Sequence, residues 1–341
     1  MIVQLSHDHT PAHADAVCDI AEQYKLTPHV EHGAQITVVC IVGTFNGHYA
    51  DVMERLRTLD GVDHVIKVSK PYKLASRMDH RADTIVRVGD VEVGGNSVAM
   101  IAGPCAIESE MRMRSIAGHV KAAGAHILRG GAYKPRTSPY SFRGLGVDGL
   151  KILHDAGAEQ DMPVVTEVMD PRQVAEAERY VDLLQVGARN MQNFNLLDEV
   201  GQAGKPVLLK RGMSATVEDL LLSAEYIMSQ GNKQVILCER GIRTFEGSTR
   251  NTFDISAVPN VRQASHLPII VDPTHATGRV DMIPSMALAG IAAGAHGIHV
   301  EVHDAPKEAL SDGPQALLPH QYAALMEQMR RVAEAIGKTV S

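Results

Sequence analysis

The first candidates for chemistry are four side chains of the kinds that bind metal ions: Cys105, His275, Glu301 and Asp312. A thiolate, an imidazole and two carboxylates together suit a borderline divalent ion such as Mn²⁺, Fe²⁺, Co²⁺ or Zn²⁺. The thiol makes the set too soft for Mg²⁺ or Ca²⁺. Each residue alone is better interpreted as a packed thiol or a loop side chain. As a set they predict a metal site, provided that the fold gathers these distant parts of the chain.

A second group of residues could bind anions. Its members are cations that end apolar runs or follow them closely: Arg129, Lys134, Arg136, Arg189, Lys210 and Arg240. Guanidinium groups grip phosphate and carboxylate through paired hydrogen bonds, and lysine supplies a point charge. Glu167, Glu239 and Asp272 are too few to pair all of these cations, and an unpaired half-buried charge costs on the order of several kcal/mol. The surplus predicts substrates with more than one anionic group.

The elements that must position these residues are eight short apolar runs, each of which ends in a polar or ionisable residue. They span 98–105, 126–131, 164–167, 183–189, 207–211, 235–240, 269–275 and 297–302. The gaps between them are long enough for a helix, so the alternation predicts an α/β fold, a closed parallel (β/α)8 TIM barrel. The active site of such a barrel lies where the strands end. Cys105, His275 and Glu301 end the first, seventh and eighth strands, which are neighbours once the barrel closes.

The N-terminal segment predicts a second, smaller domain. Residues 1–70 follow the order β-α-β-β-α-β, which is typical of a ferredoxin-like α+β domain. Residues 71–84 are interpreted as a linker, and the barrel domain as residues 85–341. The alternating segment 86–95 is expected to form a hairpin that plugs the N-terminal end of the barrel. The histidines in 7–13 are interpreted as solvated loop residues rather than metal ligands.

Composition narrows the partners and the compartment. The 341 residues carry a net charge of −7 without a long basic run, so nucleic acid is not expected as a partner. We find no signal peptide and no apolar stretch long enough to cross a bilayer, and the four cysteines are widely spaced. We therefore expect a cytoplasmic protein with reduced thiols and no membrane partner.

Seven motifs together resemble one enzyme family: AGPC (102–105), LRGGAYKPRTSPYSFRGLG (128–146), QVGARN (185–190), LLKRGM (208–213), LCERGIRTFE (237–246), DPTHATGR (272–279) and VEVH (300–303). They are similar to 3-deoxy-D-arabino-heptulosonate 7-phosphate (DAHP) synthase, in the subfamily with an N-terminal ferredoxin-like regulatory domain. The motif KPRTS separates this family from 3-deoxy-D-manno-octulosonate 8-phosphate synthase, where the loop resembles KANRS. Ala106, where serine is frequent, and Ala276-Thr277 depart slightly from the family pattern.

The resemblance implies a condensation of phosphoenolpyruvate with D-erythrose 4-phosphate, the first step of the shikimate pathway. It also implies that Cys105, His275, Glu301 and Asp312 bind a divalent metal, with Mn²⁺ as first choice. The implied substrate contacts are Arg129, Lys134 and Lys210 for the phosphoenolpyruvate carboxylate, Ala188, Arg189, Lys210 and Arg240 for its phosphate, and Arg136 and Thr137 for the aldose. Asp272 is expected to hydrogen-bond a substrate hydroxyl or a water, and Glu167 to lie beside the phosphate.

We expect three catalytic residues: Lys134, Glu167 and Asp272. The metal should act as a Lewis acid on the aldehyde oxygen. Lys134 should protonate the new alkoxide, and its cationic neighbours are expected to lower its pKa.

Regulation and assembly are also implied by the resemblance. The family pattern indicates feedback inhibition by tyrosine or phenylalanine, bound between ferredoxin-like domains of a homotetramer, with His29 near the effector. Three alternatives stay open: an octulosonate synthase that uses arabinose 5-phosphate, another metal-dependent aldolase, and a non-catalytic amino-acid sensor.

Overall fold

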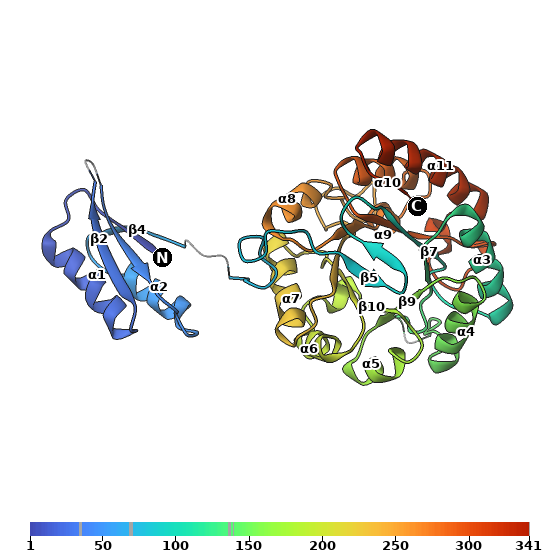
Figure 1. Cartoon of the computed structure of the whole chain (residues 1–341), viewed down its shortest axis with the longest axis horizontal. Coiled ribbons are helices and arrows are strands. Elements are labelled where there is room, and N and C mark those ends of the chain that lie inside the picture. Colours follow the sequence, from blue (N-terminus) through green and yellow to red (C-terminus); the bar gives the residue numbers. More distant parts are fainter. Residues whose placement is uncertain (34–35, 68–70, 136–137, 139, 341) are drawn as a thin grey trace. The chain divides into compact units, whose positions relative to one another are not determined.

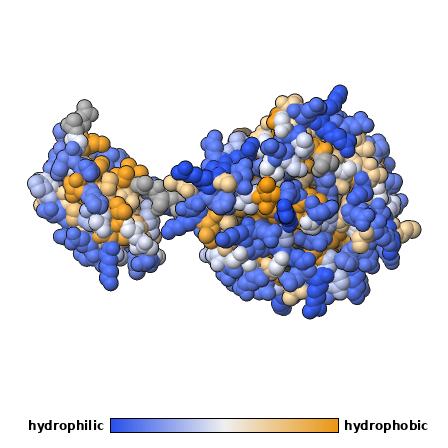
Figure 2. Space-filling model, viewed as in Figure 1, coloured by the Kyte–Doolittle hydropathy of each residue, from blue (hydrophilic) through white to orange (hydrophobic). Residues whose placement is uncertain are grey.

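The computed structural model describes the chain apart from residues 34–35, 68–70, 136–137, 139 and 341. It divides the chain into two compact units, Met1–Pro71 and Tyr72–Ser341. The face of each unit in Figure 2 is mostly hydrophilic, with apolar residues scattered across it. No helix in the described part of the chain is both long enough and apolar enough to span a membrane.

The first unit has the ferredoxin-like order that the sequence predicts. Its elements are β1 (Ile2–Leu5), α1 (Pro11–Gln23), β2 (Thr27–His32), β3 (Thr37–Val42), α2 (Tyr49–Arg57) and β4 (Val62–Ile66). The strands form an antiparallel sheet in the order β2-β3-β1-β4. Every second residue of β1 and β3 is buried, and Val3 and Val39 pack with Val17, Val52 and Leu56 of the two helices. This core gives the unit its own hydrophobic interior.

The second unit is a closed barrel of eight parallel strands, which confirms the predicted fold (Figure 1). The strands are β7 (Ala99–Gly103), β8 (Ile127–Arg129), β9 (Val164–Val168), β10 (Leu183–Val186), β11 (Val207–Lys210), β12 (Val235–Glu239), β13 (Ile269–Val271) and β14 (Gly297–Glu301). The helices around them are α3 (Glu110–Ala123), α4 (Val147–Ala158), α5 (Pro171–Ala177), α6 (Phe194–Gln202), α7 (Val217–Ser229), α8 (Ala257–Ala264), α9 (Pro273–Thr277), α10 (Ile283–Ala292) and α11 (Pro319–Ala335).

Alternation along the strands sorts the barrel interior into an apolar part and a polar part. Ile127, Leu208 and Ile270 belong to one buried apolar cluster inside the barrel. Two residues further along the same strands come Arg129, Lys210 and Asp272. Because side chains two apart on a strand share a face, the inward positions change from apolar to charged toward the strand ends. The barrel therefore gathers the polar residues at its C-terminal mouth.

A hairpin closes the opposite end of the barrel, as the sequence predicts. β5 (Val86–Val88) and β6 (Val91–Val93) pair in an antiparallel register, and β5 lies across the middle of the barrel in Figure 1. The buried side chains of Val86, Val88 and Val93 belong to the same cluster as the inward apolar residues of the strands. The hairpin thus completes the apolar floor beneath the mouth.

The segment predicted as a linker differs from that expectation, because most of it packs on the barrel. Tyr72 and Ala75 are buried in the barrel core. The carboxylate of Glu225 accepts hydrogen bonds from the backbone N–H groups of residues 73–75, at 2.9–3.0 Å. A helix residue some 150 positions away fixes this segment, and no local pattern in residues 71–84 reveals such a partner.

Candidate active site

A cleft of about 310 Å³ lies at the C-terminal mouth of the barrel. Among the described residues, six that line it are cations: Arg129, Lys134, Arg189, Lys210, Arg240 and Arg250. The ionisable lining residues also include Glu167, His275 and Asp312. The positive excess makes the cleft a place for anionic molecules in a protein whose net charge is negative.

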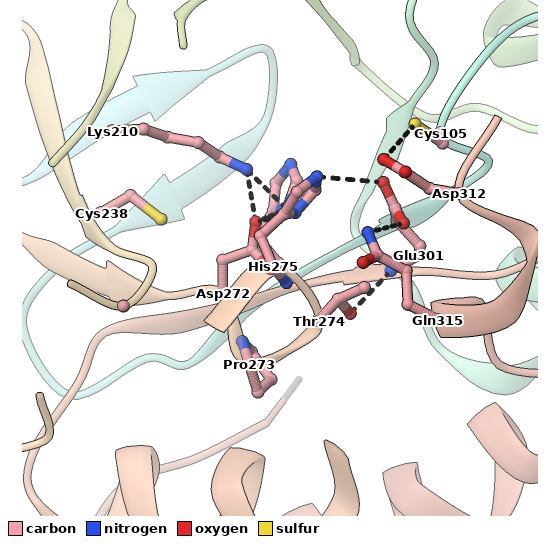
Figure 3. A network of polar contacts seen from close by, with 12 residues as sticks. Cys105, Lys210, Cys238, Asp272, Pro273, Thr274, His275, Glu301, Asp312 and Gln315 are labelled. Carbon is pink, nitrogen blue, oxygen red and sulfur yellow. Dashed lines mark hydrogen bonds and ion pairs between the residues drawn. The ribbon is translucent and has the colours of Figure 1, made fainter. Parts of the chain in front are cut away.

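The four residues predicted as metal ligands converge beside this cleft (Figure 3). Cys105, Glu301 and Asp312 each offer one ligand atom, and these atoms lie within 4.8 Å of one another. Cys105 Sγ is 3.4 Å from Asp312 Oδ2, and His275 Nε2 is 3.3 Å from Glu301 Oε1. The strand ends bring together residues that are up to about two hundred positions apart, as the sequence predicts.

A buried oxygen of Glu301 indicates whether the four predicted ligands fit a metal ion. Glu301 Oε1 is inaccessible to solvent and accepts no hydrogen bond from the described residues. Arg129 Nη2 and His275 Nε2 lie 3.2 and 3.3 Å from it. A buried carboxylate oxygen without a hydrogen bond is unfavourable, and a cation between these side chains would satisfy it. With a thiol, an imidazole and a second carboxylate around it, the group fits a borderline divalent ion.

The charge state of the ligands depends on their burial and on one another. Burial and the negative charge of Glu301 raise the pKa of the Cys105 thiol to about 12, although Lys134 opposes this shift. Burial disfavours ionisation of Glu301 too, but His275 and Arg129 outweigh it and lower its pKa to about 2. Glu301 is therefore an anion at neutral pH, whereas Cys105 stays a thiol until a cation displaces its proton.

Asp272, predicted to hydrogen-bond a substrate hydroxyl or a water, already has several partners in the protein. Its carboxylate is fully buried and does not line the cleft. Oδ1 accepts the backbone N–H of His275 (2.9 Å), and Oδ2 accepts from His275 Nδ1 (2.6 Å) and from Lys210 Nζ. His299 Nδ1 lies 3.1 Å from the same oxygen. Both oxygens of Asp272 are therefore engaged by protein groups, and these contacts orient His275 and Lys210.

Lys134 lines the cleft, but the prediction of a lowered pKa is wrong. Its Nζ donates to the backbone oxygen of Cys105 (2.9 Å) and lies 3.0 Å from Cys105 Sγ. Burial lowers the pKa of Lys134, but its interactions with Cys105 and Glu167 outweigh burial and raise it. The sequence shows the cationic neighbours of Lys134, whereas Cys105 and Glu167 come to it from other strands.

The remaining predicted substrate residues lie around the same cleft. Glu167 is the penultimate residue of β9, and Ala188 and Arg189 belong to a 3₁₀ turn, η1 (Ala188–Asn190), that follows β10 after Gly187. Arg240 is buried, and its Nη1 has no hydrogen-bond partner among the described residues. Arg136 and Thr137, predicted to bind the aldose, lie outside the described residues.

Two residues of the site went unnoticed in the sequence, Arg250 and Gln315. Arg250 lies in the long loop between β12 and α8, and Gln315 in a 3₁₀ turn, η3 (Gly313–Gln315). Neither ends an apolar run, so the strand pattern does not mark them. The one available signal is that Gln315 follows Asp312 by three positions.

The predicted N-terminal sites belong to the first unit, Met1–Pro71. His29 is an exposed residue of the edge strand β2, where it pairs with Cys40. Among the described residues, the two groups with metal-binding geometry are Asp272 with His275 and His299, and Cys105 with Glu301 and Asp312; neither includes a histidine of segment 7–13.

Comparison with known proteins agrees with this architecture. The model of the DAHP synthetase I family matches residues 73–338, and that of the DAHP synthase ferredoxin-like domain matches residues 1–70. Phospho-2-dehydro-3-deoxyheptonate aldolase of Thermotoga maritima is 48% identical over 341 residues, all of both chains. A 2-dehydro-3-deoxyphosphooctonate aldolase of Koribacter versatilis is 35% identical over 271 residues, 73% of this chain and 96% of the relative.

Two solved structures are similar as well. The crystal structure of the Thermotoga maritima enzyme has a TM-score of 0.91 and covers 99% of this chain and 98% of its own, at 48% identity. A truncated form of 3-deoxy-D-arabino-heptulosonate 7-phosphate synthase from the same organism has a TM-score of 0.74 at 47% identity. It covers 79% of this chain and 98% of its own.

Proposed function

The chain belongs to the DAHP synthetase I family, and on that premise we propose that it condenses phosphoenolpyruvate with D-erythrose 4-phosphate and water. The products are DAHP and inorganic phosphate, in the first step of the shikimate pathway. The observation that carries this proposal is the cleft itself. Cations line it, six of them in the described part of the chain, directly beside a thiol, an imidazole and two carboxylates that fit a divalent ion.

The metal would be held by Cys105, His275, Glu301 and Asp312, with Mn²⁺ as first choice among Mn²⁺, Fe²⁺, Co²⁺ and Zn²⁺. When bound, it supplies Lewis acidity that polarises the carbonyl group of the aldose. Asp272 keeps the Nδ1 proton of His275 in place, so that Nε2 faces Glu301.

The cations of the cleft bind and orient phosphoenolpyruvate. Among these lining residues, Arg129, Lys134 and Lys210 would hold the carboxylate, and Arg189, Lys210 and Arg240 would hold the phosphate. Arg240 Nη1, which has no hydrogen-bond partner in the part of the chain that the structure describes, supports an anion beside it. Arg136 and Thr137 would hold the phosphate of the aldose.

Bond formation joins C3 of phosphoenolpyruvate to the aldehyde carbon, and the aldehyde oxygen takes up a proton. Lys134 supplies that proton, since its raised pKa keeps it protonated at neutral pH. Water adds to C2, and Glu167 at the edge of the cleft accepts the proton it loses. The C2 hydroxyl then loses its proton to the departing phosphate oxygen, the C2 carbonyl forms, and cleavage of the bond between C2 and that oxygen releases inorganic phosphate.

A phosphate-release assay tests the proposal. Purified protein is mixed with phosphoenolpyruvate and either erythrose 4-phosphate or arabinose 5-phosphate, with added Mn²⁺ or with a chelator. We expect release with erythrose 4-phosphate and Mn²⁺, and loss of release with the chelator. Faster release with arabinose 5-phosphate would identify an octulosonate synthase instead, the function named for the Koribacter versatilis relative.

We also propose that the ferredoxin-like unit serves regulation. Tyrosine or phenylalanine would bind between such units of a homotetramer, with His29 on β2 close to the effector. The separate hydrophobic core of the unit supports this proposal, because a self-contained domain can bind a ligand without rearranging the barrel.

A further inference from the structure

Arg250 is a cation of the cleft whose loop is fixed to the helix that carries His275. Its backbone N–H donates to Thr277 O (2.9 Å) at the end of α9. The next residue, Asn251, is buried, and its Nδ2 donates to the backbone oxygen of His275 (2.9 Å). The loop therefore holds Arg250 in a fixed place relative to one of the proposed metal ligands.

The side chain of Arg250 reaches a second ligand through one glutamine. Arg250 Nη1 donates to Gln315 Oε1 (2.8 Å), and Gln315 Nε2 donates to Glu301 Oε2 (2.7 Å). Rotating the amide by half a turn would set donor against donor at Arg250 and acceptor against acceptor at Glu301. Gln315 therefore has a single favourable orientation, and that orientation depends on both partners.

This arrangement leaves the other oxygen of Glu301 directed toward the metal group. With Oε2 bound to Gln315, Oε1 faces His275 Nε2 at 3.3 Å (Figure 3). Arg250 Nη1 also lies 3.9 Å from Asp312 Oδ2. Arg250 thus acts on both carboxylates of the ligand set, on one through a hydrogen-bonded amide and on the other through its charge.

The same guanidinium is available to an anion. The side chain is 36% exposed and lines the cleft together with Arg189 and Arg240. A guanidinium has five N–H donors, so the bond to Gln315 leaves others free for phosphate or carboxylate. An anion that orders Arg250 also orders Gln315 and Glu301.

We propose that Arg250 binds the anionic substrate and, through Gln315, orders Glu301, so that phosphoenolpyruvate and the divalent ion strengthen each other's binding. The inference rests on the proposed function of the cleft. The first ligand to bind loses free energy because it must order these side chains. The second ligand then binds side chains that are already ordered, so its affinity is higher. Such coupling is reciprocal, so it can be measured from the metal side.

The test measures the dissociation constant of Mn²⁺ from the signal of the free ion in electron paramagnetic resonance, with and without saturating phosphoenolpyruvate and without aldose. The variants are R250Q, which removes the charge and the bond to Gln315, and Q315M, which keeps the charge and removes both hydrogen bonds of Gln315, to Arg250 and to Glu301. The matched control is R87Q, an exposed arginine of the hairpin at the far end of the barrel. Q315M leaves direct attraction between the substrate and the ion unchanged, so a loss of coupling there reports on the chain of contacts.

In the wild type and in R87Q, we expect phosphoenolpyruvate to tighten Mn²⁺ binding by about fivefold or more. In R250Q and in Q315M we expect the factor to fall below about threefold. A factor of threefold or more in either variant, or a wild type without coupling, contradicts the inference. The phosphate-release assay separates this inference from the proposed function. If the wild type releases phosphate normally while R250Q and Q315M keep the coupling, this inference is refuted and the proposed function stands.

Discussion

Cys105 determines how the site responds to pH. With the pKa of the thiol raised to about 12, the residue is protonated throughout the neutral range, although a metal requires the thiolate. Metal binding must therefore displace a proton, and the apparent affinity should rise with pH.

We expect Zn²⁺ or Mn²⁺ binding to release about one proton near pH 7, and affinity to rise about tenfold per pH unit. Calorimetric titrations in buffers of different ionisation enthalpy measure the proton directly. C40S, which changes a cysteine of the other unit, should release the same proton. Binding without proton release would show that Cys105 is not a ligand.

Lys134 carries the second prediction at this scale. K134A should lower kcat by about 10²–10⁴-fold, because it removes the proposed proton donor to the new alkoxide. Phosphate release at saturating substrates measures kcat, and circular dichroism reports whether the fold persists. K151A, at an exposed lysine of α4, is the control. A K134A protein with nearly normal kcat removes Lys134 from the mechanism.

Among the elements, α9 shows how a short helix can serve a site. It has five residues, with Asp272 as its N-cap, Pro273 at its first position and Gly278 in the left-handed conformation after its end. These start and stop residues allow so short a helix, and the cap itself positions the imidazole that follows it.

D272N and D272A separate the two tasks of that cap. Asparagine can still cap the helix but loses the charge facing Lys210 and His275, so D272N should weaken Mn²⁺ binding by about 10–100-fold. D272A should in addition lose about 1 kcal/mol of capping free energy. Mn²⁺ titration and thermal unfolding measure the two effects, and a D272N protein that binds Mn²⁺ as the wild type does would contradict the positioning role.

At the scale of the elements, strand periodicity predicts some features of the site and misses those that depend on distant neighbours. The eight strands and the convergence of Cys105, His275 and Glu301 were predictable, because inward positions change from apolar to polar where the strands end. The buried position of Asp272 and the raised pKa of Lys134 were not, since both depend on neighbours from other strands. Arg250 and Gln315 lie in irregular segments where no periodicity points inward or outward, and residues 72–75 depend on Glu225 of a distant helix.

For the whole molecule, the division into two units predicts the effect of removing the first one. A chain without residues 1–70 should keep phosphate release within about twofold and lose inhibition by tyrosine or phenylalanine, because the barrel has its own core and the effector site is assigned to the other unit. The truncated Thermotoga maritima structure shows that such a form of a relative can be solved. Initial rates with and without each amino acid make the comparison, and a truncated protein that tyrosine still inhibits would place the effector site in the barrel.

The hairpin of β5 and β6 determines how small molecules enter and leave the barrel. The valines of the hairpin fill the N-terminal end of the barrel, so apolar side chains lie below a bound substrate. Substrates and products must therefore enter and leave through the same opening, at the C-terminal mouth. The loops around this opening can therefore limit the rate of turnover. Changes in these loops that widen or narrow the opening should alter the rate of product release without disturbing the strands that hold the reacting groups.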